Sequence, residues 1–249
     1  MHGLGLASGP PGRPRSAYRG AHMQRFEWCP SRWVARLSAV AMVAALAAAP
    51  AAASALVAPV LRNGGFESGT LGQWLTSERG EPGDGWSAAS GTVSPLSEFT
   101  IPAPPRGSWQ AVVDQTERGS HVLYRDLDVT GELGLNLTLW YRNRATRFVT
   151  PQTLGPFVRP NQQLRIDLVR PTAPVRSMAD EDILATLFRT RVGAPLRIAP
   201  RVLRRDLSRF AGQTVRLRIA EVDNQGFFQA GVDAVRLVDL SAAVGAASP

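Results

Sequence analysis

An alternation of apolar and polar residues with a period of two constrains this chain most strongly, because it is the pattern of a half-buried β-strand. In the segment 133–141 every odd position is apolar, whereas the even positions 134–140 hold Gly, Asn, Thr and Trp. The same alternation recurs in the segments 123–129, 164–168, 215–219 and 228–234. Strands at such short intervals, separated by Gly- and Pro-rich turns, predict an all-β fold built as an antiparallel β-sandwich.

One segment departs from this alternation. Residues 177–188 begin with a polar stretch and continue with four apolar residues at helical spacing: Ile183, Leu184, Leu187 and Phe188. Ser177 is a residue type that caps the amino end of a helix. The pattern therefore predicts one short helix in this connecting segment.

The amino-terminal part has the layout of a secretory signal peptide. Residues 1–36 are basic and rich in Gly and Pro, and an uncharged stretch at 37–49 precedes the small residues 51–55. The apolar core of about 13 residues is shorter than the ~20 that a membrane-spanning helix needs, so we expect cleavage after Ala53 or Ala55. The preamble before Met23 is over-long, which makes Met23 an alternative start. We expect a signal peptide at 1–55, one sandwich domain at 56–240, a disordered tail at 241–249 and a secreted product.

Charge and cysteine content narrow the function further. The chain contains no Lys, so all 28 basic residues are Arg and the formal net charge is +8. From residue 56 onward 22 Arg face 19 acidic residues, a near balance that does not favour nucleic-acid binding. The single cysteine, Cys29, lies within the predicted leader, so we expect no disulfide in the mature protein.

The two ends of the predicted domain resemble those of galactose-binding-like jelly-roll domains, a superfamily that includes many carbohydrate-binding modules. The resemblance rests on Asn63-Gly-Gly-Phe-Glu67 at the start and on the segment 230–237, with its Asp-Ala-Val, at the end. The segments 114–116, 119–124, 210–217 and 221–225 are also similar to a group of secreted, mostly uncharacterised bacterial proteins. Together these motifs cover residues 61–239 and imply a jelly roll.

The resemblance also implies a structural calcium ion where the first and last strands meet. Calcium takes six to eight oxygen ligands, mainly carboxylates and backbone carbonyls. Glu67 matches the family's Glu after Phe, Asp233 matches its closing Asp, and Asp114 is a looser third candidate. Period-two counting places Asp233 on the face of Val235 and Leu237, where an unpaired carboxylate is costly. The alternative is a salt bridge or a pair of hydrogen bonds that joins the two ends of the domain.

A second candidate site is a polar sheet face, which forms if the strands that carry it are neighbours. Its members are Asn136, Thr138, Trp140 and Arg142 from one segment, Arg165 and Asp167 from another, and Arg216 and Arg218 from a third. Such a face offers an aromatic platform flanked by planar donors and an acceptor, which suits a sugar. The alternative is a solvated strand face with Trp140 packed under a loop.

Catalytic motifs are scarce. His121 is the single imidazole after the leader, and we expect it at a sheet edge. The sequence holds no Gly-x-Ser-x-Gly, His-Glu-x-x-His or phosphate-binding Gly loop. Paired carboxylates leave glycoside hydrolysis open; the available acids are Asp180, Glu181, Asp182, Glu221 and Asp223.

The sequence thus favours a secreted, non-catalytic module that binds an extracellular glycan, with calcium as a structural ion. A structural or adhesive protein that contacts a cell-surface protein is the first alternative, and a glycoside-active enzyme is the second. We expect neither a nucleic-acid partner nor a stable membrane span after cleavage.

Overall fold

The structure is a computed structural model that describes residues 61–80, 85–115, 117–157 and 159–241. The predicted signal peptide, residues 56–60 and positions 242–249 of the predicted tail lie outside the described residues. Within the described part, no helix is long and apolar enough to cross a membrane.

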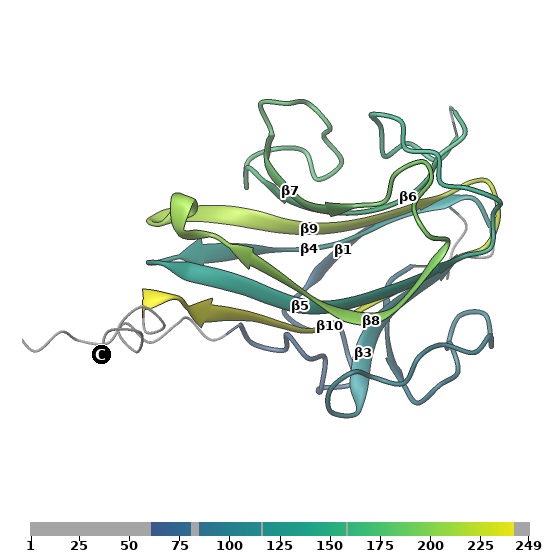
Figure 1. Ribbon diagram of the computed structural model, residues 1–249, viewed down its shortest axis with the longest axis horizontal. Helices are drawn as coiled ribbons and strands as arrows, with labels where there is room; N and C mark the ends of the chain where they lie inside the picture. Colours follow the sequence, from purple (N-terminus) through teal and green to yellow (C-terminus); the bar gives the residue numbers. More distant parts are fainter. Residues whose placement is uncertain (1–60, 81–84, 116, 158, 242–249) are drawn as a thin grey trace, which may run out of the picture. The chain divides into compact units, whose positions relative to one another are not determined.

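The described strands form two antiparallel sheets, which appear as two layers in Figure 1. Sheet A has the order β1 (Leu75–Gly80), β4 (Gly119–Val129), β9 (Gln213–Asp223), β6 (Gln162–Val169) and β7 (Ile183–Arg189). Sheet B has the order β2 (Ser87–Ser90), β3 (Trp109–Gln115), β10 (Phe228–Asp239), β5 (Leu133–Asn143) and β8 (Arg197–Asp206). The predicted all-β jelly-roll sandwich is confirmed.

The core lies between the sheets and is built by the alternation seen in the sequence. Leu135, Leu137 and Leu139 of β5 point inward and are almost completely buried. Leu217 and Ile219 of β9 pack against the same cluster from the other sheet. Because successive side chains of a strand point to opposite faces, the residues between these positions lie on the outer faces of the sandwich.

The helix predicted at residues 177–188 is wrong. Residues 180–182 form a turn, and the apolar residues that follow belong to β7, which pairs with β6 at the edge of sheet A. The pairing skips Leu184 and Leu187, at two register shifts. Each skipped residue breaks the period of two, and the resulting spacing imitates that of a helix. Pairing with the free edge of β6 then outweighs the local pattern. A 3₁₀ turn, Ser208–Phe210, follows β8.

A bulge in β10 reverses the face on which Asp233 was expected. Ala234 has a φ of +51°, and the pairing with β5 shifts register between Asp233 and Arg236. Val232 and Val235 therefore both reach the core, whereas Asp233 points to the outer side of sheet B. The prediction that Asp233 shares a face with Val235 is wrong, because one extra residue inverts the alternation.

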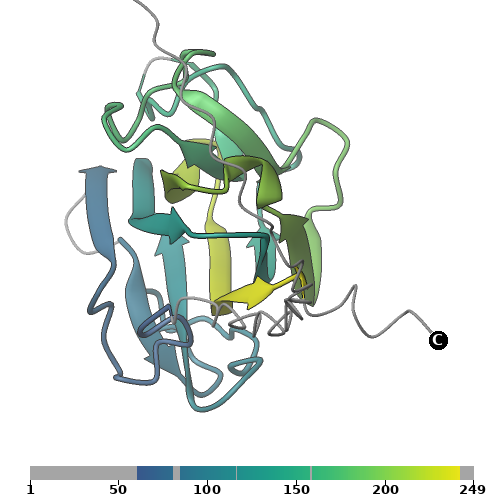
Figure 2. The ribbon, with the colours of Figure 1, turned by 90° about the vertical axis from the view of Figure 1, so that its left-hand side faces the viewer.

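Both outer faces are covered by connecting segments, which Figure 2 shows from the end of the sandwich. Residues 91–107 lie over sheet B, where Ile101 packs against Val112 and Trp140. Residues 170–182 lie over sheet A, where Val175 and Met178 pack against its outer apolar residues. The sandwich consequently leaves its edges, rather than its faces, open to a ligand.

Candidate functional site

The predicted polar face is not one surface. β5 belongs to sheet B, whereas β6 and β9 belong to sheet A, so its members lie on the two opposite outer faces. The condition that these strands are neighbours is met only for β6 and β9, which pair directly. Alternation gives the face of each strand, but it does not give the sheet to which the strand belongs.

Trp140 is buried under the covering segment, as the alternative interpretation had it. Its side chain is 1% exposed and donates a hydrogen bond from Nε1 to Oε1 of Gln110 at 2.8 Å. The indole lies against the backbone of Gly231, the directly paired residue of β10. Arg142 donates to the carbonyl oxygen of Thr100 in the covering segment. The ring of Trp140 therefore offers no face on which a sugar can stack.

The other two members on β5 border a small hollow. Asn136 and Thr138 line a hollow of about 90 Å³ together with Arg204 and Arg236. Trp140 and Arg142 border another of about 130 Å³ beside β8. Both hollows are smaller than the roughly 300 Å³ at which typical small-molecule sites begin.

On sheet A the predicted residues form a buried ion-pair cluster. Asp167 accepts hydrogen bonds from Nε of Arg165 at 2.6 Å and from Nη2 of Arg218 at 2.8 Å. Arg218 also donates to the carbonyl oxygens of Val175 and Ser177, at 3.0 and 2.6 Å. Burial lowers the pKa of Arg218, and the charge of Asp167 opposes that shift. This cluster fastens the covering segment 170–182 to the sheet.

Arg216 has a separate partner. Its guanidinium donates to both carboxylate oxygens of Asp126, at 2.7 and 3.1 Å, and lies over the ring of Tyr124. The donors of Arg165, Arg216 and Arg218 are thus engaged by the protein itself, which leaves little for a ligand on this face.

The residues proposed for calcium are partly brought together. A Cβ atom placed on Gly65 would lie 3.9 Å from Oε1 of Glu67 and 3.8 Å from Oδ1 of Asp233, so the two carboxylates face the same small space. Burial raises the pKa of Asp233, and the charge of Glu67 adds to that shift. Glu67 accepts from the amides of Ser108 and Trp109, and Asp233 accepts from the amide of Arg106 at 2.8 Å. These hydrogen bonds tie both ends of the domain to residues 106–109.

Asp114 lies elsewhere. Its carboxylate accepts hydrogen bonds from Ser97 and, at 2.9 Å, from Nε2 of Gln229, its directly paired residue on β10. Gln229 precedes Asp233 by four residues, about 13 Å along a strand. Among the described residues, no group of three or more His, Cys, Asp and Glu side chains is arranged to hold a metal ion. Two carboxylates that repel each other fit a cation, provided that backbone carbonyls supply the remaining oxygen ligands.

The acids weighed for glycoside hydrolysis do not line a common cleft. Asp180, Glu181 and Asp182 form the turn before β7. Glu221 and Asp223 are buried on β9. The prediction that His121 lies at a sheet edge is wrong, because β4 lies between β1 and β9. The Nδ1 atom of His121 is hydrogen-bonded to Oε2 of Glu78.

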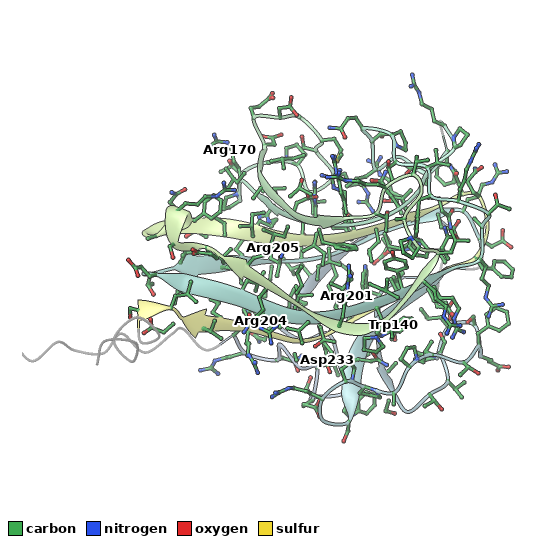
Figure 3. All side chains as sticks on the ribbon, in the orientation of Figure 1. Trp140, Arg170, Arg201, Arg204, Arg205 and Asp233 are labelled. Atoms are coloured by element: carbon green, nitrogen blue, oxygen red, sulfur yellow. The ribbon has the colours of Figure 1, made fainter. Side chains whose placement is uncertain are left out.

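The structure instead reveals a cluster of arginines on the open side of the sandwich, where the edge strands β7 and β8 approach each other. We call it the arginine edge; its members are Arg189, Arg191, Arg197, Arg201, Arg204, Arg205 and Arg209. All seven are exposed. Figure 1 looks onto this side, with β8 crossing in front of β5, and Figure 3 labels three of the arginines along β8.

Two hollows lie along the arginine edge. The first, of about 360 Å³, is lined by the aromatic rings of Tyr141 and Phe188, by Ile198, and by the loop 190–195. The second, of about 460 Å³, lies between Phe188 and Arg205. Phe188, Arg189 and Arg191 line both hollows, so the two are adjacent.

Contacts within the protein hold the floor of the first hollow. The hydroxyl of Tyr141 donates to the carbonyl oxygen of Pro195 at 3.0 Å, and burial raises its pKa. Arg201 lies 5.7 Å from the centroid of the Phe188 ring, and Nε of Arg205 donates to the carbonyl oxygen of Leu187. These contacts bridge β7 and β8, so the hollow is bounded by strands rather than by loops alone.

The arginine edge was not predicted from the sequence, although the sequence carries a signal for it. Residues 183–209 contain seven Arg and one acidic residue, Asp206. The near balance of charge over the whole segment from residue 56 conceals this local excess.

Comparisons with known proteins were made at the levels of sequence and structure. No protein-family model matches the chain, and no curated protein sequence matches it. Among solved structures, the chain is similar to a family 61 carbohydrate-binding module in complex with β-1,4-galactotriose, at 11% identity and a TM-score of 0.42. That alignment covers 72% of this chain and 97% of the module.

Two further similarities are of the same order. The K3 cleaved adhesin domain of Lys-gingipain from Porphyromonas gingivalis aligns at 14% identity and a TM-score of 0.45, over 73% of this chain and 99% of the domain. A carbohydrate-binding module of the β-sandwich superfamily with promiscuous specificity aligns at 16% identity and a TM-score of 0.41, over 70% of this chain and 60% of the other. At these identities and scores the similarity assigns neither ligand nor activity to the chain.

Proposed function

We propose that this chain is a secreted, non-catalytic binding module whose ligand is an extracellular glycan, bound in the first hollow of the arginine edge. The observation that carries the proposal is the lining of this hollow, in which aromatic and aliphatic side chains lie beside planar guanidinium donors. Its volume of about 360 Å³ falls within the ~300–1,000 Å³ typical of small-ligand sites.

The lining suits the two chemical surfaces of a sugar. A pyranose ring presents C–H groups, which pack favourably on the half-buried side chains of Phe188 and Ile198. Its hydroxyls are hydrogen-bond acceptors for the guanidinium groups of Arg191 and Arg201 at the rim. The strands on both sides carry Phe188, Ile198 and Arg201, which lowers the cost of ordering these three groups on binding.

A glycan-array screen followed by a blocking substitution tests this proposal. Ala194 is half-buried in the lining of the first hollow, and Ala194→Trp fills the space that a sugar needs. The matched control is Val93→Trp, at an exposed position of the segment that covers sheet B. We expect Ala194→Trp to abolish binding and Val93→Trp to preserve it. The absence of any bound glycan overturns the function, and binding that survives Ala194→Trp overturns the site.

Secretion is part of the same proposal and rests on the layout of the leader. We expect the exported product to begin near residue 54 or 56, which sequencing its amino terminus tests. Recovery of the uncleaved chain from the cytoplasm contradicts the proposal.

We further propose that a structural Ca²⁺ ion binds between Glu67 and Asp233. Its charge would relieve the repulsion between the two carboxylates, and its binding would join the start of the domain to β10. An ion that binds only the folded state stabilises it by about 2.7 kcal/mol at a hundredfold excess over Kd.

Thermal unfolding after thorough chelation, with and without millimolar Ca²⁺, measures this effect. We expect Ca²⁺ to raise the Tm of the wild type but not that of Asp233→Asn. Asp114→Asn is the matched control and is expected to keep the response, because Asp114 contacts Gln229 instead. If Ca²⁺ does not change the Tm of the wild type, the calcium proposal is wrong. The start of the domain and β10 are then joined by the hydrogen bonds of Glu67 and Asp233 to residues 106–109.

A further inference from the structure

We propose that the arginine edge makes this module selective for anionic glycans, whose carboxylate or sulfate groups the guanidinium forks bind. The inference rests on the proposed function and names the chemical class of its ligand. Four observations carry it: the segregation of charge, the lack of acidic partners, the geometry of the hollows, and the absence of fully exposed aromatic residues there.

Charge is unevenly distributed along the chain. Residues 183–209 hold seven Arg and a single acid, Asp206. The remainder of the chain from residue 56 onward holds 15 Arg and 18 acids. The excess positive charge of this part of the chain is thus concentrated on one edge, where it attracts anions and raises their local concentration.

The arginines of this edge have no acidic partners within the described residues. None of the seven forms an ion pair there, whereas Arg165, Arg216 and Arg218 each pair with an aspartate. Asp206 carries the one negative charge of this segment, and its carboxylate accepts a hydrogen bond from the amide of Ser208. One acid cannot balance seven guanidinium groups, which therefore repel one another, and a bound anion relieves that repulsion.

Four of these arginines line the two hollows, where their charge can act on a bound ligand. Arg189, the last residue of β7, and Arg191, in the loop that follows, line both hollows, while on β8 Arg201 lines the first hollow and Arg205 lines the second. Arg201 and Arg205 are four residues apart, about 13 Å along the strand. Anionic groups that repeat along a polysaccharide can therefore occupy both hollows. A guanidinium binds a carboxylate or a sulfate through two parallel hydrogen bonds, which adds direction to attraction.

The same features disfavour nucleic acid. Proteins that bind single strands present exposed aromatic faces for the bases, and those that read duplexes insert an element into a groove. The exposed large aromatic residues among the described positions are Phe157 and Phe227, which lie outside the hollows. Arg201 lies over the ring of Phe188, and the hollows receive a ligand rather than protrude toward one.

Binding to matched pairs of polysaccharides tests the inference. The probes are polygalacturonate against its fully methyl-esterified form, dextran sulfate against dextran, and a single-stranded oligonucleotide. We expect the charged member of at least one pair to bind tenfold or more tightly than its neutral form, and the pair that shows this identifies carboxylate or sulfate. We also expect this binding to weaken as salt concentration rises.

The double variant Arg189→Gln/Arg191→Gln removes two positive charges. The side chains of these two arginines make no hydrogen bond to a described residue, so folding should be preserved. It should weaken binding of the charged polysaccharide at least tenfold, while Arg62→Gln, an exposed arginine at the start of the domain, should not. Equal binding of charged and neutral forms overturns the inference and leaves the proposed function standing. Failure of every glycan to bind overturns both, and tighter binding of the oligonucleotide overturns the inference in favour of nucleic acid.

Discussion

Gly231→Ala tests the close packing of β10 against the Trp140 side chain in sheet B. A Cβ atom at this position would lie 2.3 Å from Cε2 and Nε1 of the Trp140 indole, far inside the usual contact distance. The indole cannot retreat freely, because the covering segment packs on it and its Nε1 is bound to Gln110. The added methyl group must therefore displace the ring.

The expected cost follows from two effects. Overpacking a core by one carbon costs about 1–3 kcal/mol, and loss of a buried hydrogen bond costs about 1–3 kcal/mol more. We therefore expect a loss of about 2–6 kcal/mol, or roughly 4–24 °C in Tm for a domain of this size. Backbone propensity alone predicts the opposite sign, because Ala is preferred over Gly within a strand by about 0.5–1 kcal/mol.

A double-mutant cycle with Trp140→Leu, measured by urea denaturation, separates the clash with the indole from the effect of Ala on the backbone. The smaller leucine side chain leaves space where the indole was, so Gly231→Ala should cost little or nothing in that background. A large cost that persists without the indole, or a wild-type background in which Gly231→Ala is neutral, would refute the reasoning.

Two further predictions concern charged groups. In urea denaturation, Arg218→Met should destabilise the domain by about 3–5 kcal/mol, because it leaves Asp167 with one partner fewer and leaves two carbonyl groups without a donor. It should also expose the segment 170–182 to trypsin. The control Arg216→Met, at a more exposed ion pair, should cost at most about 1 kcal/mol in the same assay. In calcium-free buffer, the contribution of Asp233 to the stability of the fold should fall as pH rises from the ordinary aspartate pKa through the raised pKa of the folded state, because the folded state holds this proton more tightly than the unfolded state. The unfolding free energy of the wild type relative to that of Asp233→Asn should therefore fall over this pH range. A relative unfolding free energy that rises in favour of the wild type would contradict this prediction.

The sequence predicted those strands that have one buried and one polar face. β4, β5, β6, β9 and β10 each contain an alternating segment, and together with β3, which has no such segment, they form the interior of the two sheets. The edge strands were not predicted. β8 is exposed on both sides apart from Leu203 and the half-buried Ile198, so it carries no alternation, and the skipped residues of β7 imitate helical spacing.

The site was less predictable because it depends on which strands are neighbours. The alternation placed Trp140 and Arg165 correctly on outward faces, but nothing local indicates that β5 and β6 belong to different sheets. Nor does composition show that residues 91–107 and 170–182 would cover those faces. The match of Glu67 and Asp233 to the ends of jelly-roll domains was the more informative signal, because the two residues do approach each other.

The arrangement of charge on β7 and β8 also bears on the colloidal behaviour of the protein. These strands end their sheets and present unpaired backbone groups, which can template strand addition between molecules. Exposed arginines and Pro200 on β8 oppose such pairing. The residues proposed to capture a ligand thus also keep the molecules apart in solution. Removing many of these arginines at once would abolish selectivity for anions and favour fibrillar association. An anionic polymer that neutralises their charge would likewise reduce the repulsion that keeps the edge strands of two molecules from pairing.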